Sequence, residues 1–111
     1  MAITNTRLTT IATTAVYTSS GNNAVTTMIA CNTGVINLTD ETVNASSLTV
    51  YFVPNGGVIG DGTTVVKNLT IPAGETVFFS DEKVVLGNGD AIVAEASDAN
   101  LLTITVSTLA V

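Results

Sequence analysis

The sequence predicts an all-β domain, an antiparallel β-sandwich of about eight strands with an immunoglobulin-like or jelly-roll-like arrangement. Thr, Val and Ile make up 43 of the 111 residues, and these β-branched residues favour strands over helices. Turn residues interrupt the chain roughly every 8–12 residues, a spacing typical of sandwiches and barrels. No segment keeps the apolar periodicity of a helix for two turns.

In the first part of the chain, residues 9–17 form a β-prone stretch with irregular alternation. Residues 24–31 are apolar on both faces, which favours an interior strand. Strict alternation along this strand places Val25 and Ile29 on one face and Met28 on the other.

Residues 35–38 form either a short strand or part of a long loop. The next strand, 48–53, is the clearest, because large apolar residues alternate along it with Thr and Tyr. It ends at Pro54, which cannot donate to a sheet ladder. Pro54, Gly56 and Gly57 are therefore predicted to form a turn.

Strands are also expected over 64–71 and 75–80, on either side of a Pro-Ala-Gly turn. The final strand, 102–107, alternates without a break, with three apolar side chains facing the core and three hydroxyl side chains facing out. The inward residues are Leu102, Ile104 and Val106, and the outward residues are Thr103, Thr105 and Ser107.

Residues 83–86 and 91–96 are predicted to pair as a hairpin around Asn88 and Gly89. Asn-Gly is the preferred pair for a type I′ turn, because that turn requires a positive φ at both central residues. The strands join without a linker or an internal repeat, so residues 1–111 are expected to be one domain, with residues 1–10 as an extended N-terminal arm.

The composition excludes several classes of function. The chain carries 3 basic and 9 acidic residues, for a net charge of −6, and so few cations cannot form a nucleic-acid-binding surface. There is no His, the commonest general base and metal ligand. We therefore expect no enzyme activity, no catalytic residue and no cofactor. No run of about 18 apolar residues occurs, so no membrane partner is expected.

Cys31 is the only cysteine, so an intramolecular disulfide is impossible. It continues an apolar stretch and is interpreted as a small buried hydrophobic residue. The carboxylates are expected in turns, where Asp bonds the backbone two residues on. A loop site for Ca²⁺ formed by Asp61, Asp81 and Glu82 is the alternative, although the Asp-x-Asp-x-Asp-Gly spacing is missing.

Several motifs resemble those of small virion structural proteins from tailed bacteriophages, especially phages of cyanobacteria and other aquatic bacteria. They are Leu-Thr-Val-Tyr-Phe-Val-Pro-Asn-Gly-Gly at 48–57, Ile-Pro-Ala-Gly-Glu-Thr at 71–76 and Lys-Val-Val-Leu-Gly-Asn-Gly-Asp at 83–90. The resemblance covers nearly the whole chain and implies a β-sandwich in the virion, assembled in the host cytoplasm. It implies no catalytic residue.

Three functions are candidates, the first two of which the resemblance implies. The first is a capsid decoration (cement) protein on the outside of the shell, with the major capsid protein as its partner. The second is an accessory structural subunit attached to the neck, tail or fibre. The third is a glycan-binding adhesion module, for which the low aromatic content of 5% is unfavourable.

Homo-oligomerisation, most simply as a trimer, is expected from the shortage of charged residues on the predicted strands. Uncharged strand edges associate readily with other chains unless they are covered, and a closed ring covers them without further growth. Tyr51 is the expected subunit contact, because it is a large amphipathic side chain on a Thr-rich face.

Overall fold

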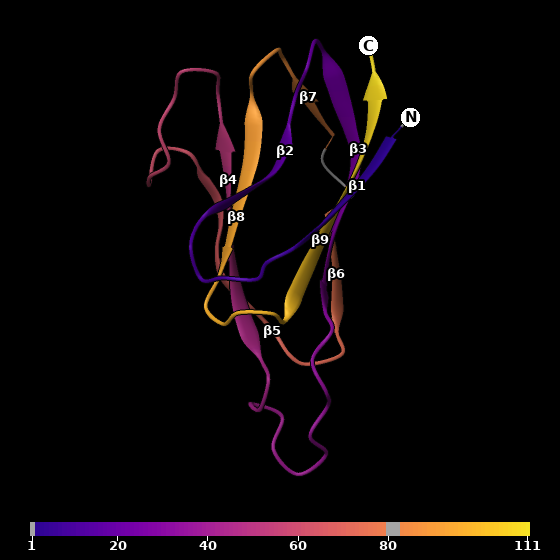
Figure 1. The fold of residues 1–111 in the computed structure, drawn as a ribbon, viewed down its shortest axis with the longest axis vertical. Coiled ribbons are helices and arrows are strands. Elements are labelled where there is room, and N and C mark those ends of the chain that lie inside the picture. The colour runs from indigo at the N-terminus through magenta and orange to yellow at the C-terminus, as the bar shows by residue number, and fades with distance from the viewer. Residues whose placement is uncertain (1, 80–82) are drawn as a thin grey trace.

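The computed structural model describes residues 2–79 and 83–111, and this part of the chain contains nine β-strands and no helix. The strands form two antiparallel sheets packed face to face, which confirms the predicted β-sandwich (Figure 1). The strands are β1 (Ala2–Arg7), β2 (Thr14–Thr18), β3 (Asn23–Asn32), β4 (Ser46–Val53), β5 (Thr64–Ile71), β6 (Thr76–Phe79), β7 (Val84–Leu86), β8 (Ala91–Ala96) and β9 (Leu102–Ala110).

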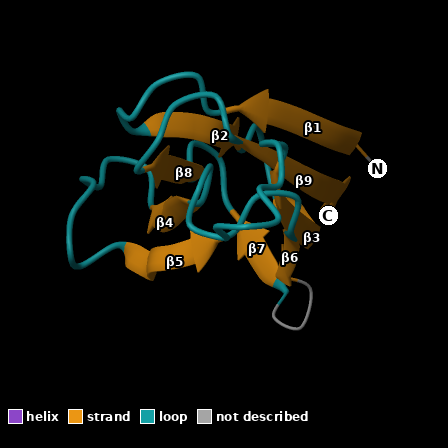
Figure 2. Cartoon of the chain, turned by 90° about the horizontal axis from the view of Figure 1, so that it is seen from below, coloured by secondary structure: helices purple, strands orange, loops and turns teal. Residues whose placement is uncertain are grey.

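The strand order is that of a jelly roll. Sheet A has the order β1-β9-β3-β6, with β7 also paired to β3, and sheet B has the order β2-β8-β4-β5. In a jelly roll, one long hairpin is rolled up so that its two halves pair strand by strand. Here β1 pairs with β9, β2 with β8, β3 with β6 and β7, and β4 with β5. Figure 2 shows the two layers end-on, with sheet B on one side and sheet A on the other.

The core lies between the sheets and is aliphatic. Ile104 is 1% exposed and the other inward residues of β9 are fully buried, as the alternation predicts. Leu48 and Val50 of β4 are also fully buried. Phe52 packs against the edge of this cluster. The register between paired strands is thus fixed by the apolar face of each strand, since a shift of one residue would expose that face.

A β-bulge in β3 overturns the face assignment that strict alternation predicts. The register shifts between Val25 and Thr27, so Val25 and Met28 both face the core. The Thr26 hydroxyl at the bulge donates to the carbonyl and hydroxyl oxygens of Ser107, at 3.1 and 2.9 Å. Cys31 consequently lies half-buried on the outer face of sheet A, and the interpretation as a core residue is wrong.

The predicted hairpin of residues 83–86 with 91–96 is also wrong. β7 pairs with β3 in sheet A, whereas β8 pairs with β2 and β4 in sheet B, so the connection crosses between the sheets. Gly89 has a φ of +86° but Asn88 does not have a positive φ. One positive φ at the third turn position is the pattern of a type II turn, not of type I′.

The turns at the upper end of Figure 1 are joined by side chains that accept backbone hydrogen bonds. The Asp90 carboxylate accepts from the backbone N–H groups of Asn55 and Gly87, both at 2.8 Å. The Asn88 side-chain oxygen accepts from the Gly21 N–H at 2.9 Å. The loops that begin at Pro54 and at Gly87 are therefore held in one network.

The opposite end of the sandwich is organised by Asn32, which is fully buried. Its side-chain nitrogen donates to the carbonyl oxygens of Asn44 and Ile71, both at 2.8 Å, and its side-chain oxygen accepts from the Gly34 N–H at 2.8 Å. The long loop 33–45, which extends furthest at the lower end of Figure 1, is fixed to the sandwich at this residue. Residues 35–38 belong to this loop and are not a strand.

The N-terminal segment 2–7 is extended, but it does not project from the domain as an arm. As β1 it pairs with β9 over six consecutive residues at the edge of sheet A. The Arg7 guanidinium donates to the Asn100 carbonyl at 2.8 Å.

Candidate functional site

The outer face of sheet B carries rows of polar side chains that cross three strands. In the central row Glu95 of β8 lies directly opposite Thr49 of β4, and Thr49 reaches Asn68 of β5. In the next row Ser97 follows β8, and its backbone N–H donates to the Ser47 carbonyl at 2.9 Å. Residues distant in sequence therefore form one hydrogen-bonding surface.

A distortion in β5 turns Asn68 toward this surface. Asn68 has a φ of +52°, which is uncommon for a residue other than Gly, and the β4–β5 register shifts at this point. The Thr49 hydroxyl, which is buried, accepts from the Asn68 N–H at 3.1 Å and donates to its side-chain oxygen at 3.3 Å. Such bulges re-aim a side chain, and they are frequent beside binding sites.

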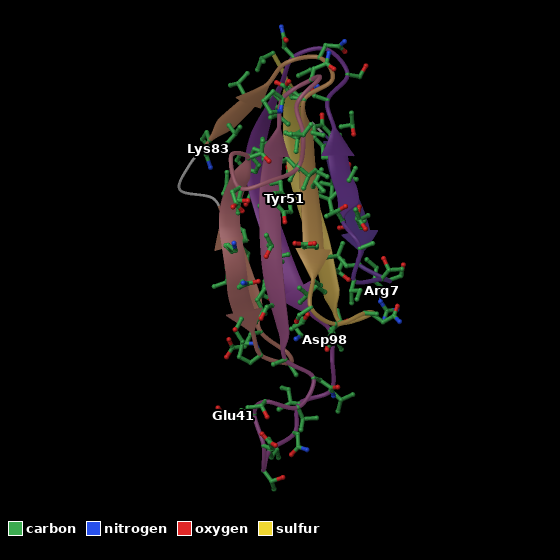
Figure 3. All side chains as sticks on the ribbon, turned by 90° about the vertical axis from the view of Figure 1, so that its left-hand side faces the viewer. Arg7, Glu41, Tyr51, Lys83 and Asp98 are labelled. Carbon is green, nitrogen blue, oxygen red and sulfur yellow. The ribbon has the colours of Figure 1, made fainter. Side chains whose placement is uncertain are left out.

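Tyr51 lies two residues beyond Thr49 on the same face of β4. Figure 3 places it midway along the face of sheet B that is turned toward the viewer. Its hydroxyl donates to Glu95 Oε1 at 2.6 Å, and this hydrogen bond, followed by desolvation, raises the pKa of Tyr51. Tyr51 is half-buried and its polar end is bonded within the chain, while its predicted role as a subunit contact stays a prediction.

We predict that Tyr51 ionises at higher pH than the usual value of about 10, because loss of the proton breaks the bond to Glu95. Any stability that Tyr51 contributes is complete below that usual value and is lost as the pH rises through the elevated pKa. Alkaline titration of phenolate absorbance in the parent and in Tyr51→Phe isolates this tyrosine from Tyr17. Glu95→Gln should lower the Tyr51 midpoint, and an unchanged midpoint contradicts the assignment.

A groove of about 250 Å³ lies over this polar surface. Its lining includes Ser47, Thr49, Asn68, Glu95 and Ser97, together with the side chain of Ile11 from the loop between β1 and β2. Ile11 is 65% exposed and forms an apolar wall. Within the described chain, the Asn68 side-chain nitrogen and Glu95 Oε2 have no protein partner.

The outer face of sheet A differs from that of sheet B because it is almost uncharged. Arg7 is the one charged residue in its five strands. Four large apolar side chains on this face are 45–67% exposed, and it is unusual for one face of a protein to expose so many of them. They are Ile3, Phe78, Val85 and Leu109.

The residues predicted to point away from the core lie on two separate faces of the sandwich. Tyr51 lies on sheet B, whereas Thr103 and Thr105 lie on sheet A, at the other side of the sandwich. Sequence alternation identifies which residues leave the core, but it does not show to which sheet they belong.

The predicted turn residues lie at the upper end of the molecule. The Gly57 N–H donates to the Pro54 carbonyl at 2.7 Å, and Gly56 has a φ of +80°, so residues 54–57 form a type II turn. Asn88 and Gly89 lie in the neighbouring turn. These positions shape the loops and bring no reactive group together.

The carboxylates are dispersed. Asp40 accepts from the hydroxyl and backbone N–H of Thr42, which lowers the pKa of Asp40, as in a local Asx turn. Asp61 forms an exposed ion pair with Lys67 at 3.8 Å. The other expected Ca²⁺ ligands, Asp81 and Glu82, lie outside the described residues. Among residues 2–79 and 83–111 no three potential metal ligands gather.

Comparison with known proteins finds no family model that matches the chain and no curated protein that matches its sequence. Within the described residues there is no helix that could span a membrane.

Proposed function

We propose that this chain is a structural protein of a tailed-bacteriophage virion, bound to the capsid exterior as a decoration subunit. The observation that carries the proposal is the nearly uncharged outer face of sheet A, with its exposed Phe78 and Val85. Large apolar side chains exposed together on one face are typical of protein–protein interfaces, and interface centres are depleted in charge.

The fold and the charge support the same role. Jelly rolls serve as capsid domains in viruses, although a shared fold alone does not establish a function. The net charge of −6 favours solubility before assembly and disfavours contact with packaged nucleic acid. The motifs at 48–57 and 83–90 resemble those of phage virion proteins. The proposed role is non-catalytic and its location is the virion.

The number of copies per virion tests this location. A decoration protein that covers the shell is expected in a copy number on the order of hundreds, whereas a neck or tail ring has a few dozen at most, set by its closed symmetry. Quantitative mass spectrometry of purified virions measures this number. Removal of the protein should also lower the temperature at which the capsid opens. A handful of copies would overturn the capsid assignment.

We further predict self-association through sheet A into a discrete homo-oligomer, with a trimer as the expected state. Val85→Asp places a charge on this face and should dissociate the oligomer without unfolding it, because Val85 is 66% exposed. Val65→Asp is the matched control, since Val65 is 49% exposed on β5 of the other sheet. Light scattering after size exclusion provides the mass.

A parent protein that remains a single 11.3 kDa species at all micromolar concentrations would contradict self-association. Equal dissociation by both Val variants would contradict an interface on sheet A. Tyr51→Ala tests the earlier expectation: dissociation by this variant alone would move the interface to sheet B.

A further inference from the structure

We propose that the groove on the outer face of sheet B binds a neutral saccharide. This site is separate from sheet A and does not depend on the proposed virion role. Its volume of about 250 Å³ is just below the roughly 300–1,000 Å³ of pockets that accept drug-sized molecules. A ligand of about one sugar ring fits this size.

The unbonded groups in the groove match the chemistry of a sugar hydroxyl pair. Glu95 Oε2 is a hydrogen-bond acceptor and the Asn68 side-chain nitrogen is a donor. Each hydroxyl of a vicinal diol both donates and accepts, so one hydroxyl can donate to the carboxylate while its neighbour accepts from the amide. Thr49 lies between these two residues in the same row across the sheet.

Both groups are held in place before any ligand arrives. The hydroxyl of Tyr51 fixes Glu95 through its other oxygen, at 2.6 Å. Thr49 bonds both the backbone and the side-chain oxygen of Asn68, which leaves the side-chain nitrogen to point elsewhere. A polar group fixed in advance loses less conformational entropy on binding.

The walls of the groove complete the saccharide chemistry. Ile11 offers an exposed apolar side chain at one border, suited to the C–H face of a sugar ring. The hydroxyls of Ser47 and Ser97 continue the polar floor. Charge determines the class of sugar. Glu95 and the net charge of −6 repel the carboxylates of uronic and sialic acids, whereas neutral sugars meet no such repulsion.

The test is a titration of the full chain followed by amide resonances in two-dimensional NMR. The probes are D-glucose, D-galactose, D-mannose and N-acetyl-D-glucosamine, with D-glucuronate as the anionic comparator and glycerol as a polyol too small to fill the groove. We expect at least one neutral sugar to give saturable shifts in residues 47–49, 68 and 95–97, with affinity in the millimolar range. Glucuronate and glycerol should bind more weakly.

Asn68→Gly should weaken this binding about tenfold, as expected for one lost hydrogen bond. The backbone should keep its conformation, because Gly accepts the positive φ at this position. Asn100→Gly is the matched control: its φ is +65° and it lies outside the groove. Glu95→Gln should weaken binding as well, whereas Glu75→Gln, which lies outside the groove, should not.

The proposal is overturned if no neutral sugar in the panel gives saturable shifts, if the shifts lie outside the groove, or if glycerol reproduces them. Tighter binding of glucuronate than of D-glucose would overturn the neutral class. Equal loss of affinity in Asn68→Gly and Asn100→Gly would show that the groove does not carry the binding. None of these outcomes changes the copy-number test of the virion role.

Discussion

Asn32→Asp is expected to lower the free energy of unfolding by roughly 3–5 kcal/mol near neutral pH, the cost of breaking a buried charge or hydrogen-bond network. Asn32 is fully buried and its amide nitrogen donates to two carbonyl oxygens. A carboxylate of the same shape cannot donate to either and would place a negative charge against both. Urea denaturation measures the loss.

The pH dependence of the Asn32→Asp variant identifies the cause. Burial beside two carbonyl oxygens raises the folded pKa of the new carboxyl above its unfolded value of about 3.9. The variant therefore loses stability relative to the parent as the pH rises from that unfolded value to the elevated folded pKa, and it recovers stability on acidification.

Asn22→Asp is the matched control, because Asn22 is exposed. It should change the free energy of unfolding by no more than about 0.5 kcal/mol. If Asn32→Asp were as stable as this control at neutral pH, the buried hydrogen-bond network at Asn32 would be refuted.

Gly89→Val is expected to cost on the order of 1–3 kcal/mol of stability. Gly89 has a φ of +86°, a conformation that a β-branched residue rarely adopts. A Cβ at this position would also lie 2.6–2.9 Å from the side-chain atoms of Asn55. Thermal unfolding monitored by circular dichroism measures the effect.

Two further variants separate backbone strain from collision. Gly62→Val introduces the same side chain where φ is not positive and no atom lies within 4 Å, so its melting temperature should stay close to that of the parent. Asn55→Ala combined with Gly89→Val removes most of the collision, and the remaining loss belongs to the backbone. An unchanged melting temperature in Gly89→Val would contradict the turn geometry.

The existence and type of most strands follow from local sequence chemistry. The uninterrupted alternation in 102–107 predicts which side chains of β9 face the core, because a strand with one buried face must alternate. The segment 64–71 is also predicted with the observed bounds of β5, since Pro and Gly residues mark its ends.

The candidate groove could not be predicted from the sequence. Glu95, Thr49 and Asn68 belong to three strands, and their alignment depends on strand order and register. The one local signal is that residue 68 is Asn, because Asn adopts a positive φ several times more often than most residues. Ten Asn residues make that signal unspecific.

The chain by itself determined a charge-poor, all-β sandwich, because composition and alternation act within a few residues of each other. Tertiary structure decided the rest. The bulge at Thr26 is stabilised by Ser107, distant in sequence, and it reverses the faces of β3. β7 pairs with β3 in sheet A and not with β8, although the Asn-Gly pair that follows it predicts a hairpin. In the sequence Asn32 resembles an ordinary strand terminator. Its side chain joins three segments only when the fold brings the carbonyl groups of Asn44 and Ile71 to it. Hydrogen bonds between distant segments have no local signature, since they form only after the sheets have packed.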